Sequence, residues 1–185
     1  GLYRIDGQEC PSHGMPRTSL LTMPPPDNAL TTYRDKRDFG ATPEPPEGGA
    51  PSPGAPRFVI QQHDASRMHY DLRLEIDGVL VSWAVPKGPS YDPEVKRLAI
   101  RTEDHPLSYA EFEGVIPEGN YGAGAVIVWD HGTFKRAHEG KGLEAEALEE
   151  GHLAVTFEGE KLQGDWTLIR TGDEDDQWLF FKMKG

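Results

Sequence analysis

Short runs of alternating hydrophobic and polar residues fill the chain from residue 57 to its end. The segments RFVIQQH, YDLRLEI, VLVSWAV, GAVIVWDHGTF, HLAVTFEG, DWTLIRT and QWLFFKMK all have this pattern. Alternation with a period of two is typical of half-buried strands. Asp77-Gly78 separates two of the runs and predicts a two-residue hairpin turn. Only GLEAEALEEG has the composition of a short helix.

These runs predict a mainly β protein, a compact single-domain barrel of about eight strands with short helices over residues 57–185. KRLAIRTEDH is a further predicted strand, and four of its polar side chains share one face with Ala99. They are Arg97, Arg101, Glu103 and His105. Because a second strand also has a polar face, we expect a barrel with a functional interior or mouth.

Residues 1–56 lack the alternating hydrophobic pattern of the rest of the chain. Residues 1–30 have no period and predict a poorly ordered tail. The segment at about 33–45 predicts a short ordered arm with alternating charge, and the proline and glycine that follow predict a flexible, extended linker. Cys10 and His13 form a CxxH pair in the tail, but a zinc site requires two further ligands, so we do not expect one there.

The stretch from His63 to Glu75 combines hydrophobic alternation with candidate chemistry. In a strand, His69, Asp71, Arg73 and Glu75 share one face. Two imidazoles and a carboxylate can ligate a divalent metal, and an arginine can hold a phosphate oxygen beside it. His63 precedes the predicted strand and would need a loop to bring it round. The alternative is an exposed strand face with cross-strand ion pairs.

Charge and composition narrow the class of protein. The 185 residues carry a net charge of −12 and one cysteine, Cys10. No apolar run approaches the roughly 20 residues of a membrane span, so we expect a soluble, cytoplasmic protein. Acidic residues crowd into 139–160 and 173–176, whereas most lysines and arginines precede Asp104. This asymmetry predicts a local cationic site on an acidic body and argues against extended wrapping of DNA.

Two other features carry weaker signals. PEGNYGAGAV is glycine-rich, but its spacing fits neither GxGxxG nor a P-loop, so it predicts a turn. His131, His138 and His152 are scattered downstream, and we expect ordinary surface or strand histidines.

The run from Arg57 to Lys135 closely resembles the 3′-phosphoesterase domain of bacterial and archaeal DNA ligase D. The matching pieces are RFVIQQHDASRMHYDLRLEIDGVLVSWAVPKGPS, RLAIRTEDHPLSYAEFEGVIPEGNYGAG and, upstream, YRDKRDFGATPEP. That domain is the end-processing module of the prokaryotic end-joining ligase. The resemblance implies a compact β-barrel with its site in a concave crescent.

Residue by residue, the resemblance implies a metal site, a phosphate site and a nucleoside site. The implied metal ligands are His63, His69 and Asp71, with Mn²⁺ preferred. Nitrogen and oxygen ligands alone also permit iron, Co²⁺ or Zn²⁺. The residues implied around the phosphate are Arg73, Lys87, Arg97, His105 and Tyr109, with the Glu103 carboxylate also important to activity. Arg37, Asp38 and Glu44 match residues needed chiefly to remove a terminal ribonucleoside.

The implied function is metal-dependent healing of DNA 3′ ends for double-strand break repair. A phosphodiesterase step would remove a terminal ribonucleoside, and a phosphomonoesterase step would then leave a 3′-hydroxyl. The expected partners are primer-template 3′ ends and the ligase and polymerase of end joining, in cis or in trans, with no membrane. The expected place is the cytoplasm, at the nucleoid during repair. The chain lacks an adenylation-type lysine motif, and the sequence leaves open whether it is free-standing.

Two alternatives remain from the residues. His69-Tyr70-Asp71 is an HxD pattern, which with His131 or His138 would form the two-histidine, one-carboxylate site of a non-haem iron oxygenase. A non-catalytic module that docks a ligase or DNA ends would bind DNA and form no product.

Overall fold

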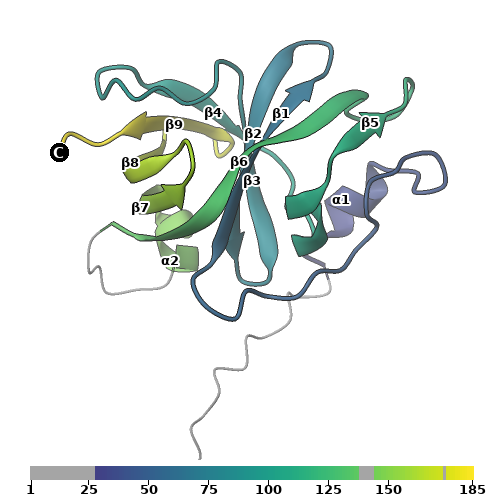
Figure 1. Cartoon of the computed structure of the whole chain (residues 1–185), viewed down its shortest axis with the longest axis horizontal. Helices are drawn as coiled ribbons and strands as arrows, with labels where there is room; N and C mark the ends of the chain where they lie inside the picture. Colours follow the sequence, from purple (N-terminus) through teal and green to yellow (C-terminus); the bar gives the residue numbers. More distant parts are fainter. Residues whose placement is uncertain (1–27, 138–143, 173) are drawn as a thin grey trace, which may run out of the picture.

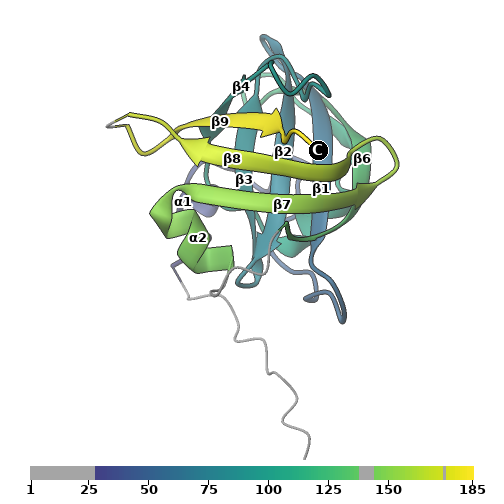
Figure 2. The ribbon, with the colours of Figure 1, turned by 90° about the vertical axis from the view of Figure 1, so that its left-hand side faces the viewer.

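A closed antiparallel β-barrel forms the body of the computed structural model, which describes residues 28–137, 144–172 and 174–185. The strands are β1 (Arg57–Asp64), β2 (Met68–Ile76), β3 (Val79–Val85), β4 (Arg97–Arg101), β5 (Gly114–Ile116), β6 (Gly124–Arg136), β7 (His152–Gly159), β8 (Gln163–Arg170) and β9 (Gln177–Lys182). Eight of them close in the order β1-β2-β3-β4-β9-β8-β7-β6, because β6 also pairs with β1 (Figures 1 and 2). The predicted mainly β barrel is confirmed.

The barrel interior is filled by apolar side chains, many of them aromatic. Phe58 of β1 packs edge-on against Phe157 of β7, with 4.7 Å between ring centroids, and Trp83 of β3 packs against Trp178 of β9. Leu72 joins the same core. Each of these five side chains is at most 1 % exposed, so the alternating apolar positions of the sequence do form one continuous core.

The hairpin predicted at Asp77-Gly78 joins β2 to β3. Ile76 pairs with Val79, and both turn residues have positive φ, 50° for Asp77 and 78° for Gly78. Such a turn matches the twist of antiparallel strands and favours glycine at its second position. The hairpin fixes the register that places Ser82 opposite Arg73.

A second layer covers the outer face of β1, β2 and β3. It contains helix α1 (Thr31–Asp35), the 3-10 helix η1 (Leu107–Glu111) and β5, which lie beside these strands and away from β7–β9 in Figure 1. Asp71 and Arg73 alternate with the interior residue Leu72, so their side chains face this second layer. The polar strand face therefore lies outside the barrel, contrary to the prediction of a functional interior or mouth.

The predicted long strand KRLAIRTEDH is shorter than expected. β4 ends at Arg101, and only an isolated bridge joins His105 to Leu80 farther on. Because the period-two alternation stops there, Arg97 and Arg101 do not share a face with Glu103 and His105.

The proline-rich linker contains no helix or strand, and it is tied to the body. Glu75 of β2 accepts hydrogen bonds from Ser52 N (2.8 Å), Ser52 Oγ (2.6 Å) and Arg57 N (3.0 Å). Burial would raise the pKa of Glu75, but these hydrogen bonds outweigh it, so the pKa is lowered. The predicted tail boundary is also too late, since Leu30 is only 8 % exposed and packs in the core.

The helix predicted from GLEAEALEEG is confirmed as α2 (Glu144–Glu150). Cys10 and His13 lie outside the described residues. Within the described part of the chain, no helix is long and apolar enough to cross a membrane.

Candidate functional site

Three of the predicted residues converge at one end of the β1–β2 hairpin. His63 of β1 pairs directly with His69 of β2, so the hairpin itself brings His63 into place and no separate loop is needed. Asp71 lies between the two imidazoles, with Oδ2 3.3 Å from His63 Nδ1 and Oδ1 3.2 Å from His69 Nε2. One ligand atom from each residue lies within 4.8 Å of the others, which is a spacing that one metal ion can bridge.

The backbone fixes how both imidazoles present their nitrogen atoms. His63 Nε2 lies 2.7 Å from the carbonyl oxygen of Gly122, and His69 Nδ1 lies 3.1 Å from that of Arg67. A carbonyl oxygen only accepts hydrogen bonds, so each of these nitrogens is the donor. The other nitrogen of each ring, Nδ1 of His63 and Nε2 of His69, faces Asp71, and in the neutral imidazole this nitrogen carries the lone pair that a metal ion would use.

This arrangement fits a divalent metal. Metal-ligating histidines characteristically donate their second ring N–H to a carbonyl or carboxylate, which sets the tautomer and the ring orientation. Two nitrogen ligands and one carboxylate oxygen suit Mn²⁺, iron, Co²⁺ or Zn²⁺. The ligand set thus supports a metal site and leaves the identity of the ion open.

Arg73 connects the metal ligands to the neighbouring polar cluster. Its Nη2 lies 3.4 Å from Asp71 Oδ2, and its Nε donates to Gln61 Oε1 at 2.7 Å. Burial would raise the pKa of Asp71, but the charge of Arg73 and the two neighbouring imidazoles hold it below its ordinary value. Asp71 is therefore ionised and ready to ligate a cation.

His105 lies between two guanidinium groups. Arg73 Nη1 is 3.1 Å from His105 Nδ1, and Arg37 Nη2 is 3.3 Å from Nε2. Burial, together with the charges of Arg73 and Arg37, lowers the pKa of His105 well below its ordinary value, so the imidazole is neutral. Nε2 accepts from the arginine, and Nδ1–H donates to the Glu103 carbonyl at 2.8 Å.

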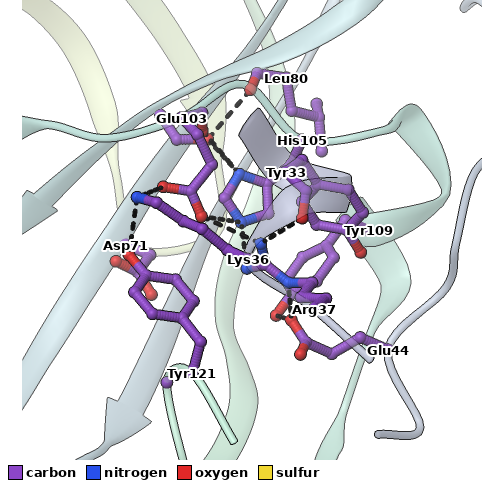
Figure 3. Close-up of polar contacts among 12 residues, drawn as sticks. Tyr33, Lys36, Arg37, Glu44, Asp71, Leu80, Glu103, His105, Tyr109 and Tyr121 are labelled. Carbon is purple, nitrogen blue, oxygen red and sulfur yellow. Dashed lines mark hydrogen bonds and ion pairs between the residues drawn. The ribbon is translucent and has the colours of Figure 1, made fainter. Parts of the chain in front are cut away.

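The arm reaches this cluster through buried ion pairs. Arg37 Nε donates to Glu44 Oε2 at 2.8 Å, and Arg37 Nη1 donates to Glu103 Oε1 at 3.1 Å. Glu44 also accepts from the Tyr109 hydroxyl at 2.7 Å (Figure 3). The Arg37 and Glu44 side chains are 5 % and 0 % exposed. Their ion pair lies within the arm, and the contacts of Arg37 with Glu103 and of Glu44 with Tyr109 fasten the arm to the cluster.

The structure adds three residues that the sequence reasoning missed. Gly122 orients His63, and Tyr121 lines the same pocket. Lys36 Nζ lies 3.2 Å from Glu103 Oε2 and 3.4 Å from the Tyr121 hydroxyl. The signal for the loop was present in the glycines of PEGNYGAGAV, since all three of them, Gly119, Gly122 and Gly124, have positive φ.

Three other predicted residues lie apart from the pocket. Lys87 is exposed just after β3, Arg97 begins β4 opposite Phe180, and neither lines the pocket. Asp38 is exposed and accepts a hydrogen bond from Gly40 N at 3.0 Å within its own turn. The roles of all three at the substrate stay predictions.

The pocket between the barrel and its second layer has a volume of about 260 Å³. The positive groups in it and at its rim are Lys36, Arg37 and Arg73, and the carboxylates are Glu44, Asp71 and Glu103. The six charges balance, so the side chains alone offer no net attraction to a phosphate. A bound divalent cation would supply that attraction.

The oxygenase alternative finds no support at this site. His131 lines a separate depression with Arg57 and Val59, away from His69 and Asp71, and His63 completes the cluster instead. His138, the other candidate ligand, lies outside the described residues, and His152 is exposed at the start of β7.

Comparison with known proteins agrees with this geometry. A family model described as the DNA Ligase D 3′-phosphoesterase domain matches residues 61–170. The multifunctional non-homologous end joining protein LigD of Pseudomonas aeruginosa is 54 % identical over 165 residues, which cover 86 % of this chain and 19 % of that protein. The multifunctional non-homologous end joining DNA repair protein LigD of Mycobacterium tuberculosis is 48 % identical over 163 residues, which cover 86 % of this chain and 20 % of that protein.

The chain therefore spans about a fifth of the length of the curated relatives it matches. The family match covers more than half of the chain, including all three candidate metal ligands, Arg73, Glu103, His105 and Tyr109. By this match, the chain belongs to the DNA ligase D 3′-phosphoesterase domain family.

Proposed function

We propose that the protein is a metal-dependent phosphoesterase that heals DNA 3′ ends for non-homologous end joining. It would first remove a terminal ribonucleoside as a phosphodiesterase and then release the 3′-phosphate as a phosphomonoesterase. The observation that carries this proposal is the convergence of His63, His69 and Asp71, with both imidazoles oriented by backbone carbonyls, beside Arg73 and His105. Family membership supports the same reaction class.

His63, His69 and Asp71 would hold the metal, for which we propose Mn²⁺. A divalent ion at such a site polarises a phosphoryl oxygen and lowers the pKa of a bound water. Arg73 would stabilise the charge that develops on the phosphate oxygens, because its guanidinium is already held by Gln61 and Ser82 and needs no reorganisation.

His105 would bind the same phosphate or act as an acid toward the leaving group. Its position between Arg73 and Arg37 supports contact with the phosphate. The acid role would require the neutral imidazole first to gain a proton, because its one N–H donates to the Glu103 carbonyl. Tyr109 would stay protonated, since burial raises the pKa of its hydroxyl. Lys87 and Arg97 would add positive charge along the DNA approaching this pocket.

The arm would serve the ribonucleoside step in particular. Arg37 and Glu44 line the pocket beside Glu103, where the nucleoside leaving group would extend from the phosphate. A bare 3′-phosphate has no nucleoside to place beside these residues. Asp38 would act with them by shaping the turn that follows α1.

The deciding experiment uses a labelled primer-template that ends in one ribonucleotide. We expect Mn²⁺ to convert this end to a 3′-phosphate and then to a 3′-hydroxyl, with the two products resolved by electrophoresis. The control is the His69→Ala variant, which should form neither product. DNA binding without product formation by the wild type, unaffected by chelation, would instead favour a docking module.

The proposed partners are DNA 3′ ends and the ligase and polymerase of end joining, joined to this chain or acting on the same break. The names of the relatives support this setting, since they are multifunctional end-joining proteins. The proposed place of action is the cytoplasm, at chromosomal DNA under repair.

A further inference from the structure

Tyr121 is the exposed aromatic residue of the pocket. It lies in the loop between β5 and β6, lines the pocket and is 46 % exposed, whereas the neighbouring Tyr33 and Tyr109 are at most 2 % exposed. A buried ring has no free face for a ligand. Lys36 Nζ and Arg37 Cζ lie over the Tyr121 ring, 4.7 and 5.3 Å from its centroid. Tyr121 is the aromatic side chain here whose exposed surface can still stack on a planar group.

The loop holds Tyr121 at a fixed place relative to the metal ligands. Gly119 and Gly122 flank it with φ of 86° and 73°, a conformation that favours glycine. The Gly122 carbonyl, one residue from the ring, accepts the hydrogen bond from His63 Nε2 at 2.7 Å. The same backbone segment thus orients a metal ligand and presents the aromatic ring.

Lys36 flanks Tyr121 from the arm. Its Nζ lies 3.4 Å from the Tyr121 hydroxyl and 3.2 Å from Glu103 Oε2, and its side chain is 39 % exposed (Figure 3). Arg37 and Glu44 are 5 % and 0 % exposed, and their polar atoms are occupied by each other and by the second layer. Lys36 and Tyr121 are thus the two groups at this rim with surface left for a substrate.

We propose that Tyr121 and Lys36 form the subsite for the leaving ribonucleoside, with the Tyr121 ring stacked on the base and the Lys36 ammonium group bonded to the sugar hydroxyls. This inference rests on the proposed function and adds which atoms recognise the nucleoside. Base–aromatic stacking tolerates any base, because every base has a π face. The subsite would therefore accept all four ribonucleosides. Arg37 and Glu44 would act by positioning Lys36.

The test combines protein variants with a change in the substrate. Primer-templates ending in a ribonucleotide, or in an abasic ribose at the same position, are treated with wild type, Tyr121→Leu and Tyr121→Phe in Mn²⁺. We expect Tyr121→Leu to lower kcat/KM on the base-bearing end by about ten-fold, in line with stacking energies measured by substitution. Tyr121→Phe keeps the ring and should stay close to wild type.

On the abasic end, wild type and Tyr121→Leu should react at nearly the same rate, because this substrate has no base on which Tyr121 could stack. An equal loss on both ends would overturn the stacking role. So would a loss in Tyr121→Phe as large as that in Tyr121→Leu, since Phe keeps the ring and removes only the hydroxyl group that contacts Lys36. Tyr91→Leu is the matched control, because Tyr91 is also exposed (53 %) but does not line the pocket.

Binding of both primer-templates, measured by fluorescence anisotropy without metal, separates this inference from the proposed function. Failure of the wild type to form any product would contradict the proposed function. The binding constants would still show whether the defect of Tyr121→Leu depends on the presence of the base. An affinity loss of about ten-fold confined to the base-bearing end supports the subsite, and a base-independent loss, or none, refutes it.

Discussion

Replacement of Glu44 by alanine should release the arm and leave the barrel folded. The Glu44 carboxylate accepts hydrogen bonds from Arg37 Nε (2.8 Å), Tyr109 Oη (2.7 Å) and Thr42 Oγ1 (3.0 Å). Removing one member of a buried ion pair costs about 3–5 kcal/mol, because the partner charge stays buried. Arg37 would keep only Glu103 as a carboxylate partner among the described residues.

The arm can avoid this cost by undocking. Its apolar anchors are Leu30 and Tyr33, and burial of each contributes about 1.5–3 kcal/mol. Ordering the arm costs backbone entropy, which offsets part of that gain. Loss of the Glu44 contacts therefore removes a large share of what holds the arm in place, and we expect the arm to undock.

Limited trypsin digestion and thermal unfolding together check this expectation. Glu44→Ala should be cleaved rapidly at Arg34, Lys36 and Arg37, while the Tm of the barrel changes by only a few degrees. Ribonucleoside removal should fall much more than release of a 3′-phosphate. Glu47→Ala, two residues after the arm, is the control, since the Glu47 side chain is 73 % exposed and its contact with Arg34 at 3.8 Å contributes little.

The opposite result would refute the reasoning. If the arm stayed protected while the Tm fell by about 10 °C or more, the cost of about 3–5 kcal/mol would be borne by the whole domain. Equal loss of both catalytic steps would show that Glu44 supports the phosphate site rather than the nucleoside step.

Three further predictions concern the β1–β2 hairpin. His69→Ala should abolish both activities and weaken Mn²⁺ binding in calorimetry with the barrel still folded, and retained affinity would refute the ligand assignment. Arg73→Ala should keep the metal but raise the activation free energy by about 1.5–3 kcal/mol or more, the range for a charged hydrogen bond, as measured by kcat/KM. The lowered pKa of Glu75 stabilises the fold above the ordinary pKa of a glutamate, and this contribution disappears as the pH falls through the lowered value. In urea unfolding, Glu75→Gln should therefore be destabilised at pH 7 and approach wild type in acid, and a pH-independent difference would contradict this cause.

The sequence by itself determined the strands, the hairpin and the chemistry of one strand. Period-two alternation was a sufficient signal because a barrel strand has one face in the core and one outside it, as Leu72 and Asp71 do. Asp77-Gly78 located the hairpin turn because only a few residue types accept positive φ at both positions. The resemblance to a known domain then assigned His63, His69 and Asp71 together.

Only the tertiary structure decided which side of the barrel carries the site and what surrounds it. Alternation places Asp71 and Arg73 opposite the apolar face, but it cannot distinguish the interior of a barrel from its exterior. That choice depends on the aromatic side chains of β7, β8 and β9, which fill the interior and exclude charged groups.

The contact between Lys36 and Tyr121 could not be predicted from the sequence either, because these two residues are 85 positions apart. No local period links residues so far apart, and their contact arises only when the arm docks against the loop before β6. The role of Gly122 could not be predicted from its residue type either, because it is the backbone carbonyl that orients His63. Local patterns therefore fixed the strands and their faces, whereas long-range packing decided which side chains meet over the pocket.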